Sequence, residues 1–135
     1  MKTEEKIRLL KEGEKIWSWI AKELKRQPDI FDNTLDAKIK AFFANGIKLQ
    51  YYAFCPACEI AMTIKPRLTT CDNCPLDMPN HCGPGSSYYL FSNDIHESWA
   101  HKHAEAIAKA FTDAIERQEM ILDAENDYCY DCGND

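Results

Sequence analysis

Residues 55–82 read CPACEIAMTIKPRLTTCDNCPLDMPNHC and contain two Cys-x2-Cys pairs, Cys55/Cys58 and Cys71/Cys74, with twelve residues between them. In each pair the two-residue spacer lets a tight turn direct both sulfurs to one point. Two such turns make a tetrahedral thiolate site of the kind that structural Zn2+ prefers. Buried free thiols are the alternative, but they do not require this spacing. The four cysteines therefore predict one closed zinc site.

Three further cysteines bear on the ligand assignment. Cys82 makes five central thiols for a site that takes four ligands. It is either spare or a substitute for one of the four, and we expect the symmetrical set formed by the two pairs. Cys129 and Cys132 either build a second site with Cys82 and a histidine or belong to an unstructured tail, and we favour the tail. The histidines available to such a site are His81, His96 and His101.

Apolar residues recur at steps of three and four from residue 4 to about residue 26, which is the period of an amphipathic helix. They are Ile7, Leu10, Trp17, Ile20, Ala21 and Leu24. Trp17 and Trp19 point about 200° apart on such a helix, so we expect Trp17 in the core and Trp19 partly exposed. A second, shorter helix is predicted over residues 35–44, between capping residues at 32–34 and a left-handed stop at Asn45 and Gly46.

Short apolar runs after these helices predict strands. Residues 47–54 begin with alternating apolar and polar side chains and end in a run rich in aromatic residues. Residues 60–64 form a second apolar run after the first cysteine pair. Residues 88–91 add a last strand or cover the metal site with aromatic rings. A strand, a cysteine turn, a second strand and another cysteine turn are the layout of a zinc ribbon.

A long helix is predicted after residue 92. Asp94 and Glu97 have the spacing of a capping box, and an alanine-rich stripe continues to about residue 123, which suits close packing on the N-terminal helix. The predicted fold class is α+β, with helices at both ends packed together around a small zinc-ribbon-like β module that holds the four paired cysteines. The single domain, 1–135, then comprises N-terminal helices (1–46), the zinc module (47–91), the long helix (92–123) and an acidic, flexible tail (124–135).

The formal net charge of -6 argues against a general electrostatic grip on nucleic acid, because binding to phosphates requires clustered lysine and arginine. The charge is uneven, since residues 1–26 carry eight basic against five acidic residues and residues 116–135 carry seven acids against one arginine. No apolar run suits a membrane span and no signal-peptide pattern is present. Cysteines in metal-type pairs suit a reducing compartment. We expect a soluble, cytoplasmic protein.

Five segments carry a resemblance: IWSWIAKEL (16–24), CPACEIA (55–61), CDNCPL (71–76), His81 with Cys82, and SSYYLF (86–91), followed by an alanine-rich helix. Together they are similar to a group of small cysteine-rich proteins encoded by bacteriophages. The resemblance covers about residues 15–111. It implies a phage or prophage origin and a metal site, and no particular activity. The acidic CYDC segment at Cys129 and Cys132 departs from the pattern of the group.

Catalysis has little support in the sequence. A four-thiolate zinc ion has no open position for a reactive water, and the histidines near residue 100 do not form the His-Glu-x-x-His pattern of zinc proteases. We therefore expect a protein without enzymatic activity.

The favoured function is that of a phage-encoded, zinc-binding inhibitor of a host protein. The expected target is a CRISPR effector or another nucleic-acid-handling defence complex, because an acidic surface can occupy a basic channel made for nucleic acid. Such an inhibitor would be anti-CRISPR-like. The residues expected to contact the partner are Glu116, Glu119, Asp123, Glu125, Tyr88 and Tyr89.

The alternative function is a nucleic-acid-binding zinc ribbon that acts in phage transcription or replication. It would use Lys65 and Arg67 for phosphates and the two tyrosines for stacking on bases. These two cations are surrounded by acidic residues, and we therefore favour the inhibitor. The acids are Glu59, Asp72 and Asp77.

Overall fold

The computed structural model describes residues 1–48, 56–57, 60, 75–76 and 86–134, and beyond residue 126 it describes the backbone alone. These ranges contain the helices α1 (Thr3–Arg26), α2 (Thr34–Ala44), α4 (Ser87–Asp94) and α5 (Ala100–Asn134). Within the same ranges no residue lies in a strand. The described part of the chain is therefore all-helical.

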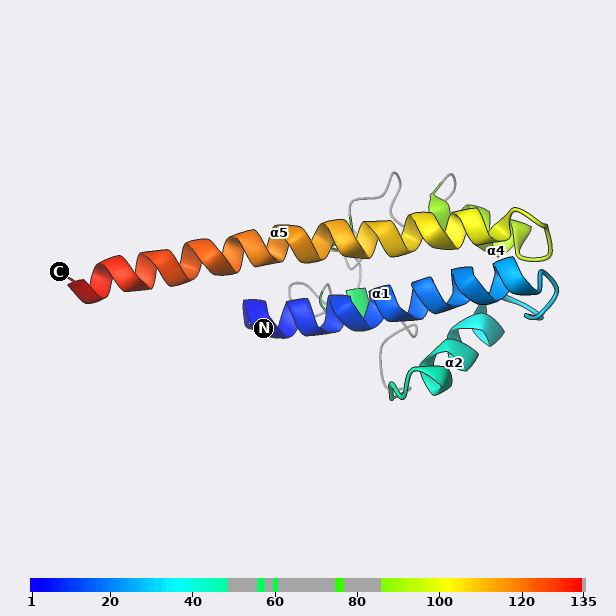
Figure 1. Ribbon diagram of the computed structural model, residues 1–135, viewed down its shortest axis with the longest axis horizontal. Coiled ribbons are helices and arrows are strands. Elements are labelled where there is room, and N and C mark those ends of the chain that lie inside the picture. The colour runs from blue at the N-terminus through cyan, green and yellow to red at the C-terminus, as the bar shows by residue number, and fades with distance from the viewer. Residues whose placement is uncertain (49–55, 58–59, 61–74, 77–85, 135) are drawn as a thin grey trace, which may run out of the picture.

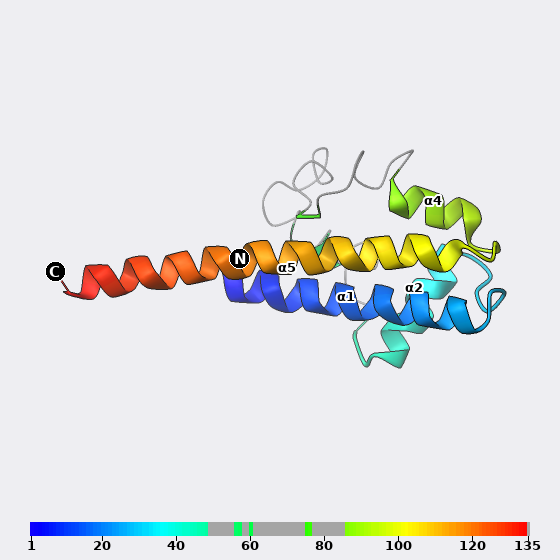
Figure 2. The ribbon, with the colours of Figure 1, turned by 45° about the horizontal axis from the view of Figure 1, so that its top comes forward.

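Helices α1 and α5 form an antiparallel pair at the centre of the structure (Figure 1). The start of α1 and the end of α5 lie toward the same end of the pair, and α5 projects past the first residue of α1 (Figures 1 and 2). Helix α2 packs on α1, and α4 packs on α5. The predicted association of the N-terminal helix with the long C-terminal helix is confirmed.

Apolar residues on the facing sides of α1 and α5 form the core. On α1 the buried positions follow the predicted period, and Trp17 is buried whereas Trp19 is only partly so. On α5 small alanines alternate with larger side chains, which lets the two helices approach closely. The buried apolar residues of α5 are Ala100, Ala104, Ile107, Ala108, Ala110, Phe111, Ala114 and Ile115.

Gly13, near the middle of α1, lies against the ring of Phe111. A Cβ atom built on Gly13 would lie 2.1 Å from Cε1 and 2.5 Å from Cζ of that ring. Carbon atoms in favourable contact are about 3.5–4.0 Å apart, and Phe111 is fully buried. A glycine weakens an isolated helix, but here it provides the space that a large ring of α5 occupies.

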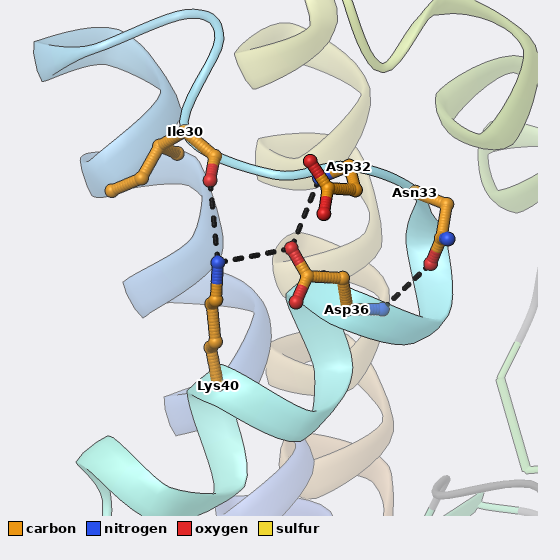
Figure 3. Close-up of polar contacts among 5 residues, drawn as sticks. All are labelled: Ile30, Asp32, Asn33, Asp36 and Lys40. Carbon is orange, nitrogen blue, oxygen red and sulfur yellow. Dashed lines mark hydrogen bonds and ion pairs between the residues drawn. The ribbon is translucent and has the colours of Figure 1, made fainter.

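Helix α2 begins in a network of caps (Figure 3). Asn33 Oδ1 accepts a hydrogen bond of 2.8 Å from the backbone N–H of Asp36, and the Asp36 carboxylate accepts one of 3.0 Å from the backbone N–H of Asp32. Lys40 pairs with the same carboxylate at 3.0 Å. The bond from Asp32, helped by Lys40, outweighs partial burial and lowers the pKa of Asp36. The helix ends before Gly46, whose φ is 66°, so the predicted second helix and its left-handed stop are confirmed.

Residues 88–91, predicted to form a strand or an aromatic cover, belong to α4. The Ser86 hydroxyl caps this helix by accepting a hydrogen bond of 3.1 Å from the backbone N–H of Tyr89. Tyr88 and Phe91 are three residues apart and share a helix face. Both rings meet Trp17 edge-on, at centroid distances of 6.0 and 5.1 Å. The cap and the shared face explain why this aromatic run is helical.

The predicted fold class, α+β with a zinc-ribbon-like β module, is wrong. Ile60, predicted to begin a strand, is helical, as are residues 56–57 and 88–91. The remaining residues of the two other predicted strands, 49–54 and 61–64, lie outside the described residues. A short apolar run has too few periods to separate a strand from a buried helix, and this ambiguity is the source of the error.

The long helix differs from its prediction at both ends. Asp94 does not cap α5 but is the last residue of α4, and its carboxylate accepts hydrogen bonds from the side chains of Trp99 and His103. Helix α5 starts at Ala100 and runs to Asn134. It therefore continues beyond residue 123, where the sequence pattern placed its end.

Candidate functional site

The predicted zinc ligands Cys55, Cys58, Cys71 and Cys74, and the substitute Cys82, lie outside the described residues. The side chains of Cys129 and Cys132 do so as well, although both positions are within α5. In the part of the chain that the structure describes, no three metal-ligating side chains come together. The zinc site therefore stays a prediction from the spacing and the soft thiolate chemistry of the cysteines.

Some neighbours of both cysteine pairs are described, namely residues 56–57, 60 and 75–76, and most of them are buried in the core. Pro56 and Ala57, between the first two cysteines, are fully buried, and so is Ile60. Leu76, two residues after Cys74, is buried in the same cluster as the apolar faces of α1 and α5. On each side of the twelve-residue spacer, the chain beside a cysteine pair is thus attached to one hydrophobic core.

A hydrogen bond reinforces the second attachment. Arg117 of α5 donates from Nη2 to the backbone oxygen of Pro75 at 2.8 Å. Pro75 directly follows Cys74 in the sequence, and residues 75–76 are thus held by α5 as well as by the burial of Leu76. The same helix turn that carries Arg117 also begins the acidic surface described next.

Three of the predicted contact acids form what we call the acidic face of α5: Glu116, Glu119 and Asp123. All three are exposed, and steps of three and four residues place them on one side of the helix. None of them takes part in an ion pair with another described residue. Met120, inside this span, is 72% exposed. The acidic face is an exposed surface whose charges are not paired within the described part of the chain.

Glu125, predicted to act with these acids, is placed elsewhere. It lies about half a turn around the helix from Glu116 at 100° per residue. Its two carboxylate oxygens accept hydrogen bonds of 2.9 and 3.2 Å from Thr3 Oγ1. Thr3 is buried, so Glu125 fastens the start of α1 to α5 and does not belong to the acidic face.

The side chains of the two predicted contact tyrosines, Tyr88 and Tyr89, lie in different environments. The Tyr88 hydroxyl accepts a hydrogen bond of 2.7 Å from Lys38 Nζ of α2, and its ring packs on Trp17. Lys38 is itself buried. Tyr89 is 41% exposed, because consecutive helix residues point about 100° apart. Tyr88 is thus partly buried and held by these contacts, whereas Tyr89 is the more exposed of the two.

A polar cluster closes the corner between α4 and α5. Asp94 Oδ2 accepts hydrogen bonds of 3.1 Å from both Trp99 Nε1 and His103 Nε2. The bond from Trp99 and then that from His103 lower the pKa of Asp94. In the described residues no hydroxyl or thiol joins His103 to complete a nucleophilic triad. The cluster holds the turn between two helices.

A shallow groove on α1 was not anticipated from the sequence. It has a volume of ≈ 250 Å³ and extends to Asn45, the residue that follows α2. Its lining combines two lysines with one aromatic ring, and it consists of Glu14, Lys15, Ser18, Trp19, Lys22 and Asn45. The signal that could have revealed it is the recurrence of lysine at helical steps along residues 11–25.

Compared with known proteins, the chain matches no family model, no curated protein and no solved structure. Among the described helices, none combines the length and the apolar character that crossing a bilayer requires.

Proposed function

We propose that the protein is a non-enzymatic, zinc-binding protein that binds and inhibits a host protein through the acidic face of α5. The observation that carries this proposal is the lack of ion-pair partners for Glu116, Glu119 and Asp123 in the described residues. Like charges at i, i+3 and i, i+4 destabilise a helix by about 0.2–0.5 kcal/mol per pair. A basic partner surface would remove this repulsion, so the acidic face favours a basic partner.

The proposed role of zinc is structural. Four thiolates at Cys55, Cys58, Cys71 and Cys74 form a donor set that suits Zn2+ and leaves no open coordination position. The burial of Ala57 and Leu76 beside the two pairs supports this role, because residues close to both pairs share one core. Zinc would then hold the segment between α2 and α4 against the helical pair, with Cys82 as the alternative ligand.

The proposed target is a nucleic-acid-handling complex such as a CRISPR effector. A protein surface that binds nucleic acid carries clustered lysine and arginine, and an acidic helix is electrostatically complementary to such a surface. The resemblance to phage-encoded cysteine-rich proteins supports a defence complex of the bacterial host as the specific choice. The predicted compartment is accordingly the host cytoplasm.

The test is a pull-down from the bacterial host with the full chain as bait, before and after nuclease digestion. The variant Glu116→Gln/Glu119→Gln/Asp123→Asn should lose the captured protein, and the loss should be smaller at high salt because ions already screen the attraction. A control variant with the same change in charge uses exposed acids outside the face. It is Asp29→Asn/Glu97→Gln/Glu105→Gln.

Equal capture by the two triple variants would contradict the proposal, because the acidic face would then be no more than a solvated surface. If nuclease digestion abolishes capture of the host protein by the parent chain, the proposal is contradicted as well, since nucleic acid would then bridge the two proteins.

A further inference from the structure

The exposed side of α1 carries a row of lysines that we call the basic stripe: Lys11, Lys15, Lys22 and Lys25. All four are exposed. Their steps of four, seven and three residues place them within an arc of about 80° and over about 21 Å of helix. In the part of the chain that the structure describes, none of the four has an acidic partner.

The arginines at the two ends of this side of the helix differ from the stripe. Arg8 pairs with Glu12 at 3.2 Å, and Arg26 pairs with Glu23. Glu12 and Glu23 are thus paired with arginines at the ends of the row, while the four lysines between these arginines take part in no ion pair with another described residue. The result is a local positive surface on a chain whose formal net charge is -6.

The groove on α1 lies within the basic stripe. Lys15 and Lys22 line it together with Ser18, and Trp19 supplies its aromatic wall. The Trp19 ring is held by Phe31, with 5.9 Å between the ring centroids. The one carboxylate in the lining, that of Glu14, accepts a hydrogen bond of 3.1 Å from Thr112 Oγ1 of α5. The groove therefore offers one lysine on each side of an aromatic side chain that is held in place.

We propose that the basic stripe binds the phosphate backbone of a single-stranded nucleic acid and that Trp19 stacks on one of its bases. A row of cations with an interleaved aromatic ring is the combination that binds single strands without sequence preference. A duplex would satisfy the lysines but would leave Trp19 unused, because its bases are already stacked. This inference goes beyond the proposed function, since it concerns another helix and another surface.

The overall acidity of the chain does not oppose this binding at ordinary salt. At an ionic strength of 0.15 M charges are screened beyond about 8 Å, so a strand on α1 responds mainly to the charges beside it. Sequence composition averages the lysines of α1 with the acids of α5. The structure assigns the two sets to different helices, and the average hides the stripe.

The test measures the binding of a short fluorescent oligothymidylate to the full chain by anisotropy at several salt concentrations. Release of counterions from about four phosphates predicts a slope of about -3 for log K against log [salt], from about -0.7 per contact on single strands. The variant Lys11→Gln/Lys15→Gln/Lys22→Gln should reduce the slope to about -1 and weaken binding at low salt by about tenfold or more.

The matched control is Lys2→Gln/Lys48→Gln/Lys102→Gln, which removes the same charge from exposed lysines outside the stripe. It should bind like the parent protein. Trp19→Phe, which keeps an aromatic ring on Phe31, should weaken binding to the single strand and leave the salt slope unchanged. Circular dichroism should show the same helix content in all variants, because the replaced lysines are exposed.

Three results would overturn the inference. Equal losses in the two lysine variants would mean that only net charge matters. Duplex binding as tight as single-strand binding would remove the role of Trp19. A protein that self-associates, and loses this association in the stripe variant without binding the oligonucleotide, would make a second copy of the chain the occupant. The acidic-face variant should bind the oligonucleotide at least as well as the parent, so this test and the pull-down fail independently.

Discussion

Replacing Gly13 by alanine should destabilise the protein, although the same change stabilises most helices. Alanine is favoured over glycine in a helix interior by about 1 kcal/mol. The new Cβ atom would lie 2.1 Å from Cε1 and 2.6 Å from Cδ1 of Phe111. The ring is fully buried, and it has to move by more than an ångström in a packed core.

Overpacking of this kind costs about 1–3 kcal/mol and occasionally more. The contact to Phe111 is short along one whole edge of the ring, so we expect the upper end of that range and a net loss of about 2 kcal/mol. For a chain of this size the melting temperature should fall by about 5–10 °C. Urea unfolding gives the free energy, provided that the slope of the transition is the same for both proteins.

A double-mutant cycle with Phe111→Leu separates the clash from other effects. In the Phe111→Leu background the ring edge is absent, so Gly13→Ala should cost little or even stabilise through helix propensity. Ser18→Ala, at an exposed position of the same helix, reports propensity without the clash. The reasoning is refuted if Gly13→Ala raises the stability of the parent protein as much as Ser18→Ala does.

Two further predictions concern acid and metal. Asp36→Asn should lower stability at pH 7 by about 1 kcal/mol or less. Because the pKa of Asp36 is lowered, its contribution to stability is complete above about pH 4 and is lost as the pH falls through the folded-state pKa. The melting curves of the two proteins should therefore converge at low pH. A difference in melting temperature that stays constant with pH would exclude titration of Asp36 as the cause. Chelation of zinc, or the substitution Cys58→Ser, should lower the melting temperature, because metal binding contributes folding free energy and because Ala57 and Ile60 beside Cys58 are core residues. An unchanged melting curve would exclude a structural metal.

The helices were predictable where an amphipathic period was long or a cap was explicit. Helix α1 keeps its regular apolar spacing over its whole length, and α2 has Asn33 before it and Gly46 after it. The choice of Trp17 over Trp19 as the core residue followed from their angular separation and from the place of Trp17 in the apolar stripe. Such signals lie within one element and need no knowledge of its neighbours.

The prediction of a β module was wrong because the apolar runs behind it were short and because their secondary structure depends on tertiary contacts. Aromatic residues favour strands in general, yet Tyr88 and Phe91 pack together on Trp17, and the Ser86 cap starts a helix ahead of them. Asp94 was assigned to the wrong helix for a related reason. Its partners Trp99 and His103 are side chains, and a capping pattern read from sequence does not include them.

The candidate surfaces were predictable only in part. The spacing of Glu116, Glu119 and Asp123 located the acidic face, but the position of Glu125 opposite Thr3 required the packing of α1 on α5. The basic stripe was missed because charges were counted over a whole segment. Glu5, Glu12 and Glu23 in that segment pair with Arg8 and Arg26, and Glu14 bonds to Thr112, but the count did not separate these acids from the lysines.

The arrangement of the two charged faces has a measurable consequence for their mutual influence. The contacts of Thr112 with Glu14 and of Glu125 with Thr3 place residues 116–123 of α5 beside the first turns of α1. At 1.5 Å per residue most of the stripe is farther away along the helix than the screening length of about 8 Å at 0.15 M salt, but within the length of about 30 Å at 0.01 M. The acids of α5 therefore repel a strand on the basic stripe at low salt and hardly affect it at high salt. Neutralising Glu116, Glu119 and Asp123 should strengthen oligonucleotide binding at 0.01 M and leave it unchanged at 0.15 M. This change makes the salt slope of the acidic-face variant steeper than that of the parent, whereas the slope of the lysine variant becomes shallower. A response to net charge alone would change the slope in the same two directions. The control Lys2→Gln/Lys48→Gln/Lys102→Gln, which removes the same charge outside the stripe, therefore has to keep the slope of the parent if the binding surface is local to α1.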